Sequence, residues 1–161
     1  MRTCWVLDHP AHVRLLAPFI RSGSTSDVII ATDRVEVRQL LDSSEGVLPK
    51  RQQLWVERPV GQKRVQIAWK RMRTVRSFLK KAQRAGSRIE RIVSIGAPLE
   101  LRVAKRWKIR KRFYITDTEV NHLAHRIALS AASEVLITTH RDLYLDGGWL
   151  AKIECKGVAI H

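Results

Sequence analysis

The sequence predicts an α/β fold in which the strands form a parallel β-sheet. The first observation is that short, continuous apolar runs alternate along the chain with longer stretches whose apolar residues recur at helical spacing. The second is that 161 residues, of which 45% are hydrophobic and 28% charged, have the size and composition of one globular domain. Because parallel strands joined by helices wind with right-handed crossovers, we expect a single Rossmann-like domain over residues 1–161, with a doubly wound sheet of about six strands and helices on both faces.

The expected strands are short runs of apolar and β-branched residues. The runs TCWVLD and DVIIAT are the clearest because they are continuous, whereas the third run is weaker and is closed by Pro59. In order, we expect strands at Thr3–Asp8, Asp27–Thr32, Gln53–Glu57, Arg91–Ile95, Arg112–Thr116 and Glu134–Thr139. The last apolar piece, Val158–Ile160, is expected to be a connector or an edge element.

The expected helices follow the strands, and their apolar residues recur at spacings of three and four. Two of them have a capping residue, Asp33 for the second helix and Asp117 or Thr118 for the fifth. One face of the first helix is expected to be formed by Val13, Leu16, Phe19 and Ile20. In order, we expect helices at Ala11–Arg21, Asp33 to about Leu41, Gln62–Ala85, Pro98–Trp107 and Thr118–Ala132.

The longest expected helix, 62–85, combines an apolar stripe with a cationic face and is expected to stop at Gly86. The stripe comprises Val65, Trp69, Met72, Val75 or Arg76, and Leu79. The cationic face could bind an anionic membrane surface or the phosphates of a nucleic acid, or it could be a solvated face of a basic protein. Its residues are Lys63, Arg64, Lys70, Arg71, Arg73, Lys80, Lys81 and Arg84.

The whole chain is strongly basic. Lysine and arginine number 30 against 15 aspartates and glutamates, which gives a net charge of +15 and a pI near 10.9. Such a field attracts nucleic acid, anionic lipid and phosphorylated substrates without choosing among them. Because the sequence shows no secretory signal, no membrane-spanning apolar run and no cysteine framework, we expect a cytoplasmic protein, with a peripheral position at the inner membrane face if the basic helix binds lipid.

The first loop of the predicted sheet, Asp8 to His12, is the densest candidate site. In a doubly wound sheet the ligand crevice lies at the carboxyl ends of the strands, and this loop follows the first strand with one carboxylate and two imidazoles. His12 or His9 could act as a general base there, and the adjacent helix N-terminus favours an anion. The alternative is that His9 caps the helix and His12 packs against a neighbour. The loop lacks a glycine-rich fingerprint, so it is not a usual dinucleotide-binding turn.

Two further loops contribute candidate binding residues at the same expected edge. Gly96 follows the fourth strand, where glycine lets the backbone approach a ligand or simply allows a tight turn. Thr116, Asp117, Thr118 and Glu119 end the fifth strand. Their oxygens could bind sugar hydroxyls, and Asp117 could orient a histidine. The alternative for this loop is helix capping, which is compatible with ligand binding.

Histidine spacing gives only a weak metal pattern. His9 with His12, and His122 with His125, form two His-x-x-His pairs, and helical spacing of three can present two ligands to one ion. No cysteine cluster or His-Glu-x-x-His motif accompanies them. We therefore expect neither a metal site nor a cofactor.

The sequence resembles an uncharacterised prokaryotic protein family with a GT-B glycosyltransferase-like fold. Members of that family carry an aspartate-histidine-proline-alanine-histidine loop after the first strand and an acidic Asp-Thr-Glu-like element after the fifth, as this chain does at 8–12 and 117–119. The resemblance covers nearly the whole chain. Its segments are DHPAHVRLLAPFI at 8–20, DVIIATDR at 27–34, IGAPLELRVAKRWKI at 95–109, ITDTE at 115–119 and RIALSAASEVLIT at 126–138.

The resemblance implies that the chain is the N-terminal, acceptor-binding half of a GT-B-like glycosyltransferase or nucleotide-sugar enzyme. The C-terminal half, which binds the donor, is expected to be absent, so activity would need that half or a partner chain. His12-Val13 is similar in position to a histidine-valine pair of the lipid-linked N-acetylglucosaminyltransferase of cell-wall synthesis, whose histidine is proposed as the base on the acceptor hydroxyl. The implied base is His12, or else His9, oriented by Asp8 or Asp117.

A second reading of the sequence is a non-enzymatic basic domain. In that case the charge itself is the function, and the partner is a nucleic acid or an anionic membrane surface.

Overall fold

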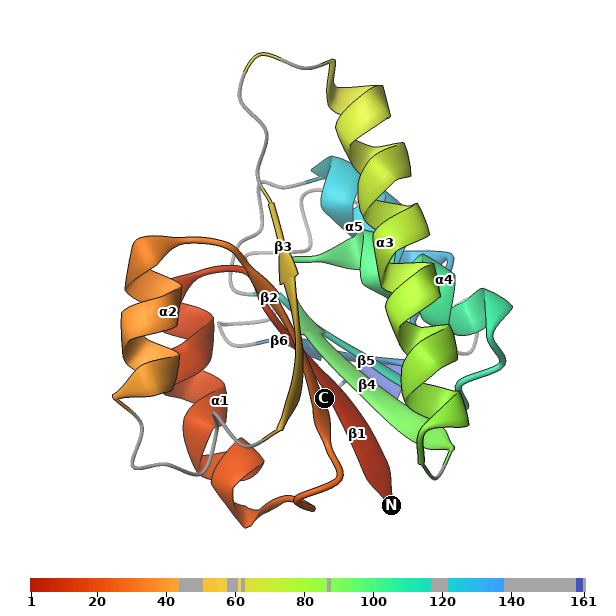
Figure 1. Cartoon of the computed structure of the whole chain (residues 1–161). Helices are drawn as coiled ribbons and strands as arrows, with labels where there is room; N and C mark the ends of the chain where they lie inside the picture. The colour runs from red at the N-terminus through yellow and green to blue at the C-terminus, as the bar shows by residue number, and fades with distance from the viewer. Residues whose placement is uncertain are drawn as a thin grey trace. The chain divides into compact units, whose positions relative to one another are not determined.

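The computed structural model describes residues 1–43, 51–57, 61, 63–86, 88–116 and 122–137, together with the backbone of 159–160 (Figure 1). The chain divides into two compact units, Met1–Glu90 and Arg91–His161. The prediction of a single domain over 1–161 stays a prediction.

The first unit is built on three parallel strands. β1 (Arg2–Leu7) pairs with β2 (Val28–Thr32), which pairs with β3 (Gln52–Val56). Every residue of β1 and β2 is buried, which explains why these strands read as continuous apolar runs. The helices α1 (Pro10–Ser22) and α2 (Val35–Asp42) lie on one side of these strands, and α3 (Arg64–Arg84) lies on the other (Figure 1).

The second unit repeats the alternation of strand and helix. Its strands pair in the order β4-β5-β6-β7, and all the pairings are parallel. β4 (Ile89–Ile95) begins at the boundary of this unit, and the elements that follow are α4 (Pro98–Arg106), β5 (Lys111–Thr116), α5 (His122–Leu129), β6 (Glu134–Ile137) and β7 (Ala159–Ile160).

The predicted fold class is confirmed: the chain has an α/β, Rossmann-like, doubly wound fold with parallel strands. The observed elements match the expected ones to within a few residues at each described end. Asp33 is not the cap of α2, because the helix begins at Val35 and the Asp33 carboxylate instead accepts from Arg38 at 2.6 and 3.0 Å. The expected caps Asp117 and Thr118 lie outside the described residues.

Two apolar faces differ from the predicted ones. On α1 the buried set recurs at i, i+3, i+4 and i+7, as Val13, Leu16, Ala17 and Ile20. Phe19 is about 100° around the helix from Ile20 and is 60% exposed, so its predicted place in the core is wrong.

The predicted stripe on α3 is buried only in its C-terminal half. Val75 and Leu79 pack in the core, but Val65 is 80% and Trp69 57% exposed. The first turns of α3 extend beyond the strands of this unit, so they have no sheet to pack on (Figure 1).

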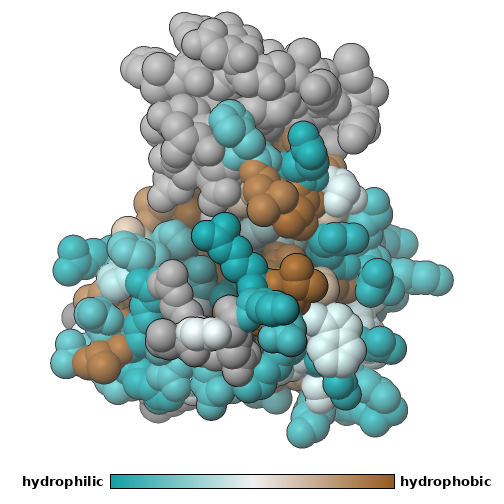
Figure 2. Space-filling view, turned by 90° about the horizontal axis from the view of Figure 1, so that it is seen from above, coloured by the Kyte–Doolittle hydropathy of each residue, from teal (hydrophilic) through white to brown (hydrophobic). Residues whose placement is uncertain are grey.

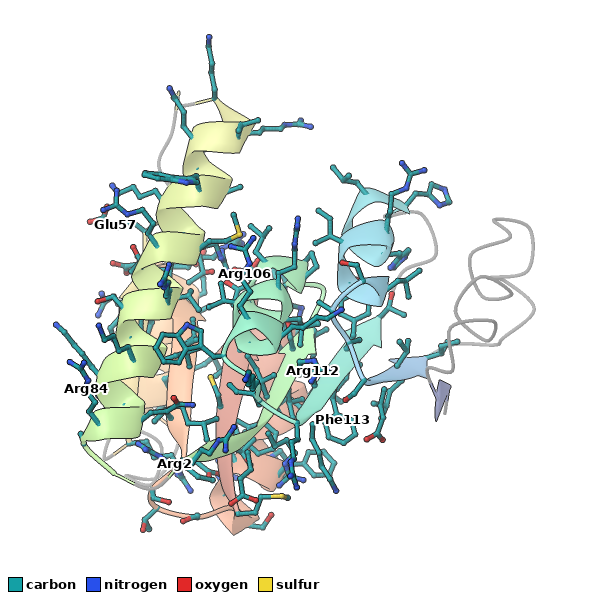
Figure 3. The ribbon with its side chains drawn as sticks, turned by 90° about the vertical axis from the view of Figure 1, so that its right-hand side faces the viewer. Arg2, Glu57, Arg84, Arg106, Arg112 and Phe113 are labelled. Atoms are coloured by element: carbon teal, nitrogen blue, oxygen red, sulfur yellow. The ribbon has the colours of Figure 1, made fainter. Side chains whose placement is uncertain are left out.

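Some of the arginines hold the ends of helices. Arg2 is buried and donates to the carbonyl oxygens of Ala82, near the end of α3, and of Ser26, each at 2.6 Å; Figure 3 shows it near that end of the helix. Arg51 is also buried and donates to the carbonyl oxygen of Ile20, in the last turn of α1, at 2.6 Å. The last carbonyls of a helix lack i+4 N–H partners, so these side chains give buried terminal carbonyl oxygens a hydrogen bond, in addition to the Gly23 N–H that reaches Ile20 at 3.2 Å. Part of the positive charge is therefore structural.

Candidate functional site

Three side chains meet at the carboxyl ends of β1 and β2. Asp8 directly follows β1 and Thr32 ends β2, and the register, with Leu7 opposite Ala31, places the two strand ends side by side. The Thr32 hydroxyl donates to Oδ1 of Asp8. Arg71, from α3, donates from Nη2 to the same oxygen at 3.0 Å and from Nη1 to the Thr32 hydroxyl oxygen at 3.5 Å.

These contacts keep Asp8 ionised. Burial by itself raises the pKa of Asp8, but the charge of Arg71, the hydrogen bonds from Thr32 and Arg71, and the charge of His12 together lower it below its ordinary value. The carboxylate is therefore suited to accepting hydrogen bonds from a ligand, and it is a weak base.

The two histidines of the first loop have different roles. His9 is the N-cap of α1, and its Nδ1 accepts from the backbone N–H of Ala11 at 3.3 Å, as the capping alternative predicts. Nδ1 of His12 accepts from the backbone N–H of Asp8 at 3.3 Å. In this arrangement a neutral His12 ring has its proton on Nε2, where it is a donor. A base role for His12 therefore requires this backbone hydrogen bond to break, and that role stays a prediction.

An open pocket of about 310 Å³ lies beside this cluster. Arg71 belongs to both, because its guanidinium bonds Asp8 and its side chain lines the pocket. Lys70 approaches the Glu57 carboxylate at 3.7 Å at the pocket wall, and Figure 3 shows Glu57 beside the N-terminal half of α3. The lining residues are Trp55, Val56, Glu57, Ile67, Lys70, Arg71 and Thr74.

The remaining predicted site residues belong to the second unit. Gly96 has φ +59°, and a Cβ built there would meet no heavy atom within 4 Å, so its backbone conformation and not crowding favours glycine. Its N–H donates to the Ile115 carbonyl oxygen at 3.1 Å. Thr116 ends β5 and is buried. Asp117, Thr118 and Glu119 lie outside the described residues, so the meeting of these loops with Asp8 and His12 stays a prediction.

The predicted cationic face of α3 is corrected at one position. Arg71 is turned towards Asp8 and its side chain is only 17% exposed, because a carboxylate lies within its reach. Arg73 instead stacks on Trp69, with its guanidinium carbon 4.5 Å from the ring centroid. The other cations of this face are exposed, as Figure 3 shows for Arg84. Among them, only Lys70 forms an ion pair with a described carboxylate. The rest are Lys63, Arg64, Lys80, Lys81 and Arg84.

In the described part of the chain, neither a metal-binding cluster nor a membrane-spanning helix is found. Within it, no group of three or more His, Cys, Asp and Glu side chains is placed to hold a metal ion. His125 is buried with its Nδ1 3.2 Å from the Tyr114 hydroxyl, whereas His122 is exposed. None of the described helices is both long and apolar enough to span a bilayer.

Sequence reasoning missed part of this site. Arg71 is separated from Asp8 by 63 positions and carries no local signal that distinguishes it from the other cations of its helix. Trp55 and Glu57 do carry a signal, because they lie at the carboxyl end of a predicted parallel strand.

No protein-family model matches the chain, and no curated protein matches it in sequence.

Proposed function

We propose that this chain is the acceptor-binding half of a GT-B-like glycosyltransferase or nucleotide-sugar enzyme, acting with a donor-binding half or a partner chain. The observation that supports the proposal is the Asp8–Thr32–Arg71 cluster beside a pocket at the carboxyl end of β3. Ligands of open α/β sheets bind at this edge. The proposal also draws on the resemblance of the first and fifth loops to a GT-B-like family.

In the proposed reaction each residue of the first loop has a separate task. The ionised Asp8 carboxylate accepts a hydrogen bond from an acceptor hydroxyl and orients it. His12 lies against the same loop and removes the hydroxyl proton once an acceptor displaces the Asp8 N–H from Nδ1. His9 remains a helix cap and takes no part in the chemistry.

The test is sugar transfer by this chain together with the product of a neighbouring reading frame that encodes a second Rossmann-like half. His12→Ala is expected to lower the transfer rate by about 100-fold, the typical contribution of a general base. His9→Ala is the matched control and should stay within a few-fold of the wild type, because the cap contributes only to helix stability. Unchanged transfer by His12→Ala would remove the base assignment, and the absence of transfer with every such partner would contradict the proposed function.

A second candidate function is peripheral binding to an anionic membrane, and the exposed start of α3 favours it. Val65 and Trp69 lie four residues apart on one helix face, with Lys63, Arg64 and Arg73 nearby. Seen from above, brown hydrophobic side chains lie exposed among teal hydrophilic ones (Figure 2). Tryptophan and aliphatic side chains flanked by cations are typical of helices that lie in the bilayer interface.

Co-sedimentation with vesicles tests this candidate. We expect binding to phosphatidylcholine vesicles that contain phosphatidylglycerol, and little binding to phosphatidylcholine alone. Trp69→Ser should weaken the binding by about tenfold, whereas Phe19→Ser, which removes an equally exposed aromatic ring from α1, should leave it unchanged. Equal loss in both variants, or a preference for RNA over vesicles at equal charge, would contradict a membrane role for α3.

A further inference from the structure

The pocket beside the Asp8 cluster has two chemically different walls. One is a stripe of α3 in which Ile67, Lys70, Arg71 and Thr74 recur at i, i+3, i+4 and i+7. The other is the carboxyl end of β3. Its volume of about 310 Å³ is at the small end of the roughly 300–1,000 Å³ typical of ligand sites. It therefore suits a compact ligand and not an extended cofactor.

The helical wall favours an anion. α3 has eight lysines and arginines over Arg64–Arg84 and no aspartate or glutamate. Lys70 is 61% exposed, and its 3.7 Å approach to Glu57 is a long, solvent-exposed contact that contributes little to stability. Another anion can therefore replace the Glu57 carboxylate on Lys70 at low cost. Arg71 is the next residue after Lys70, and its hydrogen bond to Asp8 orients its guanidinium. A compact ammonium and a planar guanidinium therefore line the same pocket.

The strand wall favours a polyol. Trp55 and Val56 line this wall, and Glu57 supplies acceptor oxygens. Apolar residues beside a carboxylate suit the C–H groups and hydroxyls of a sugar. The Trp55 ring is held in place because the guanidinium carbon of Arg38 stacks 4.1 Å from its centroid.

From these two walls we infer that the pocket binds a sugar phosphate. The phosphate lies between Lys70 and Arg71 and replaces Glu57 on Lys70, and the released Glu57 carboxylate accepts hydrogen bonds from the sugar hydroxyls. This inference rests on the proposed function, because in that function the sugar phosphate would be the acceptor itself or the head group of the acceptor. It does not need transfer to occur in order to be tested.

The test is a titration of the full chain with glucose 6-phosphate, inorganic phosphate and glucose at constant ionic strength, followed by the indole N–H signal of Trp55 in an NMR spectrum. We expect saturable binding of glucose 6-phosphate, weaker binding of phosphate and the weakest binding of glucose. Lys70→Gln should weaken glucose 6-phosphate binding by about tenfold, as loss of a charge-assisted hydrogen bond does. Lys80→Gln makes the same charge change on the same helix but outside the pocket, so its affinity should stay within twofold.

Glu57→Gln should change the affinity in the opposite direction. Removal of the competing carboxylate charge should tighten the binding of inorganic phosphate several-fold, which a merely structural role for Glu57 would not produce. Equal weakening by Lys70→Gln and Lys80→Gln would show general attraction to a basic helix and overturn the inference, as would the absence of saturation by glucose 6-phosphate. Saturable, Lys70-dependent binding without any sugar transfer would retain this inference and reject the proposed function.

Discussion

Replacement of Gly23 by alanine is expected to lower the free energy of unfolding by about 3 kcal/mol, although its backbone angles are ones that alanine adopts readily. A Cβ at this position would lie 2.6 Å from Oδ2 of Asp27 and 3.3 Å from the carbonyl oxygens of Phe19 and Ile20. Asp27 cannot move away without loss, because its buried carboxylate accepts from the Thr3 backbone N–H at 2.8 Å and from the Trp5 indole N–H at 3.0 Å. Urea unfolding of the full chain measures the effect.

A double-mutant cycle separates this steric cause from a general effect on the turn. Asp27→Ala alone should also be destabilising, because it leaves two buried donors without their acceptor. Gly23→Ala should then add little to Asp27→Ala, since the oxygen that it would strike is gone. Full additivity of the two changes would mean that the carboxylate is not the obstacle.

Replacement of Arg71 by methionine is expected to cost about 2 kcal/mol at pH 7, a value between those of exposed and fully buried ion pairs. The change leaves the half-buried Asp8 carboxylate with its Thr32 hydrogen bond and without its cation. Arg76→Met is the matched control on the same helix, and it should stay within about 0.5 kcal/mol because Arg76 is exposed.

The contribution of the Asp8–Arg71 pair should depend on pH in one direction. The pKa of Asp8 is lowered in the folded chain from an ordinary value of 3.8, so the stabilisation is complete above about that pH. It is lost as the pH falls through the lower folded-state pKa and Asp8 takes up a proton. Urea unfolding at pH 7 and below pH 3 should therefore show a large difference between wild type and Arg71→Met at pH 7 and a smaller one in acid. A difference that grows in acid would contradict this assignment.

The sequence predicts the fold well where burial is continuous. β1 and β2 are buried on both faces and have the apolar runs that such strands require, so their placement follows from composition alone. The buried face of α1 is harder to predict. Either Ala17 or Phe19 could belong to it by helical spacing, and only the position of the sheet decides which one is buried. Local pattern cannot supply that position.

The candidate site is predictable only in the part that comes from strand ends. The sequence predicts that the first loop follows β1, at the edge of a parallel sheet where ligands bind. The sequence does not predict the partner of the Asp8 carboxylate. Arg71 comes from α3, on the side of the strands opposite α1 and α2, and has the same local pattern as its basic neighbours. The sequence leaves the capping role of His9 open, and the φ of −143° and the contact with the Ala11 N–H define it.

The arginines that hold the helix ends bond to backbone groups that carry no charge. Arg2 and Arg51 donate from their guanidinium groups to backbone carbonyl oxygens, which do not titrate. Reagents that modify lysine, or acids that protonate carboxylates, would therefore change the electrostatic surface and leave these anchors in place. The charge of exposed side chains can therefore change without loss of the contacts that hold the ends of α1 and α3.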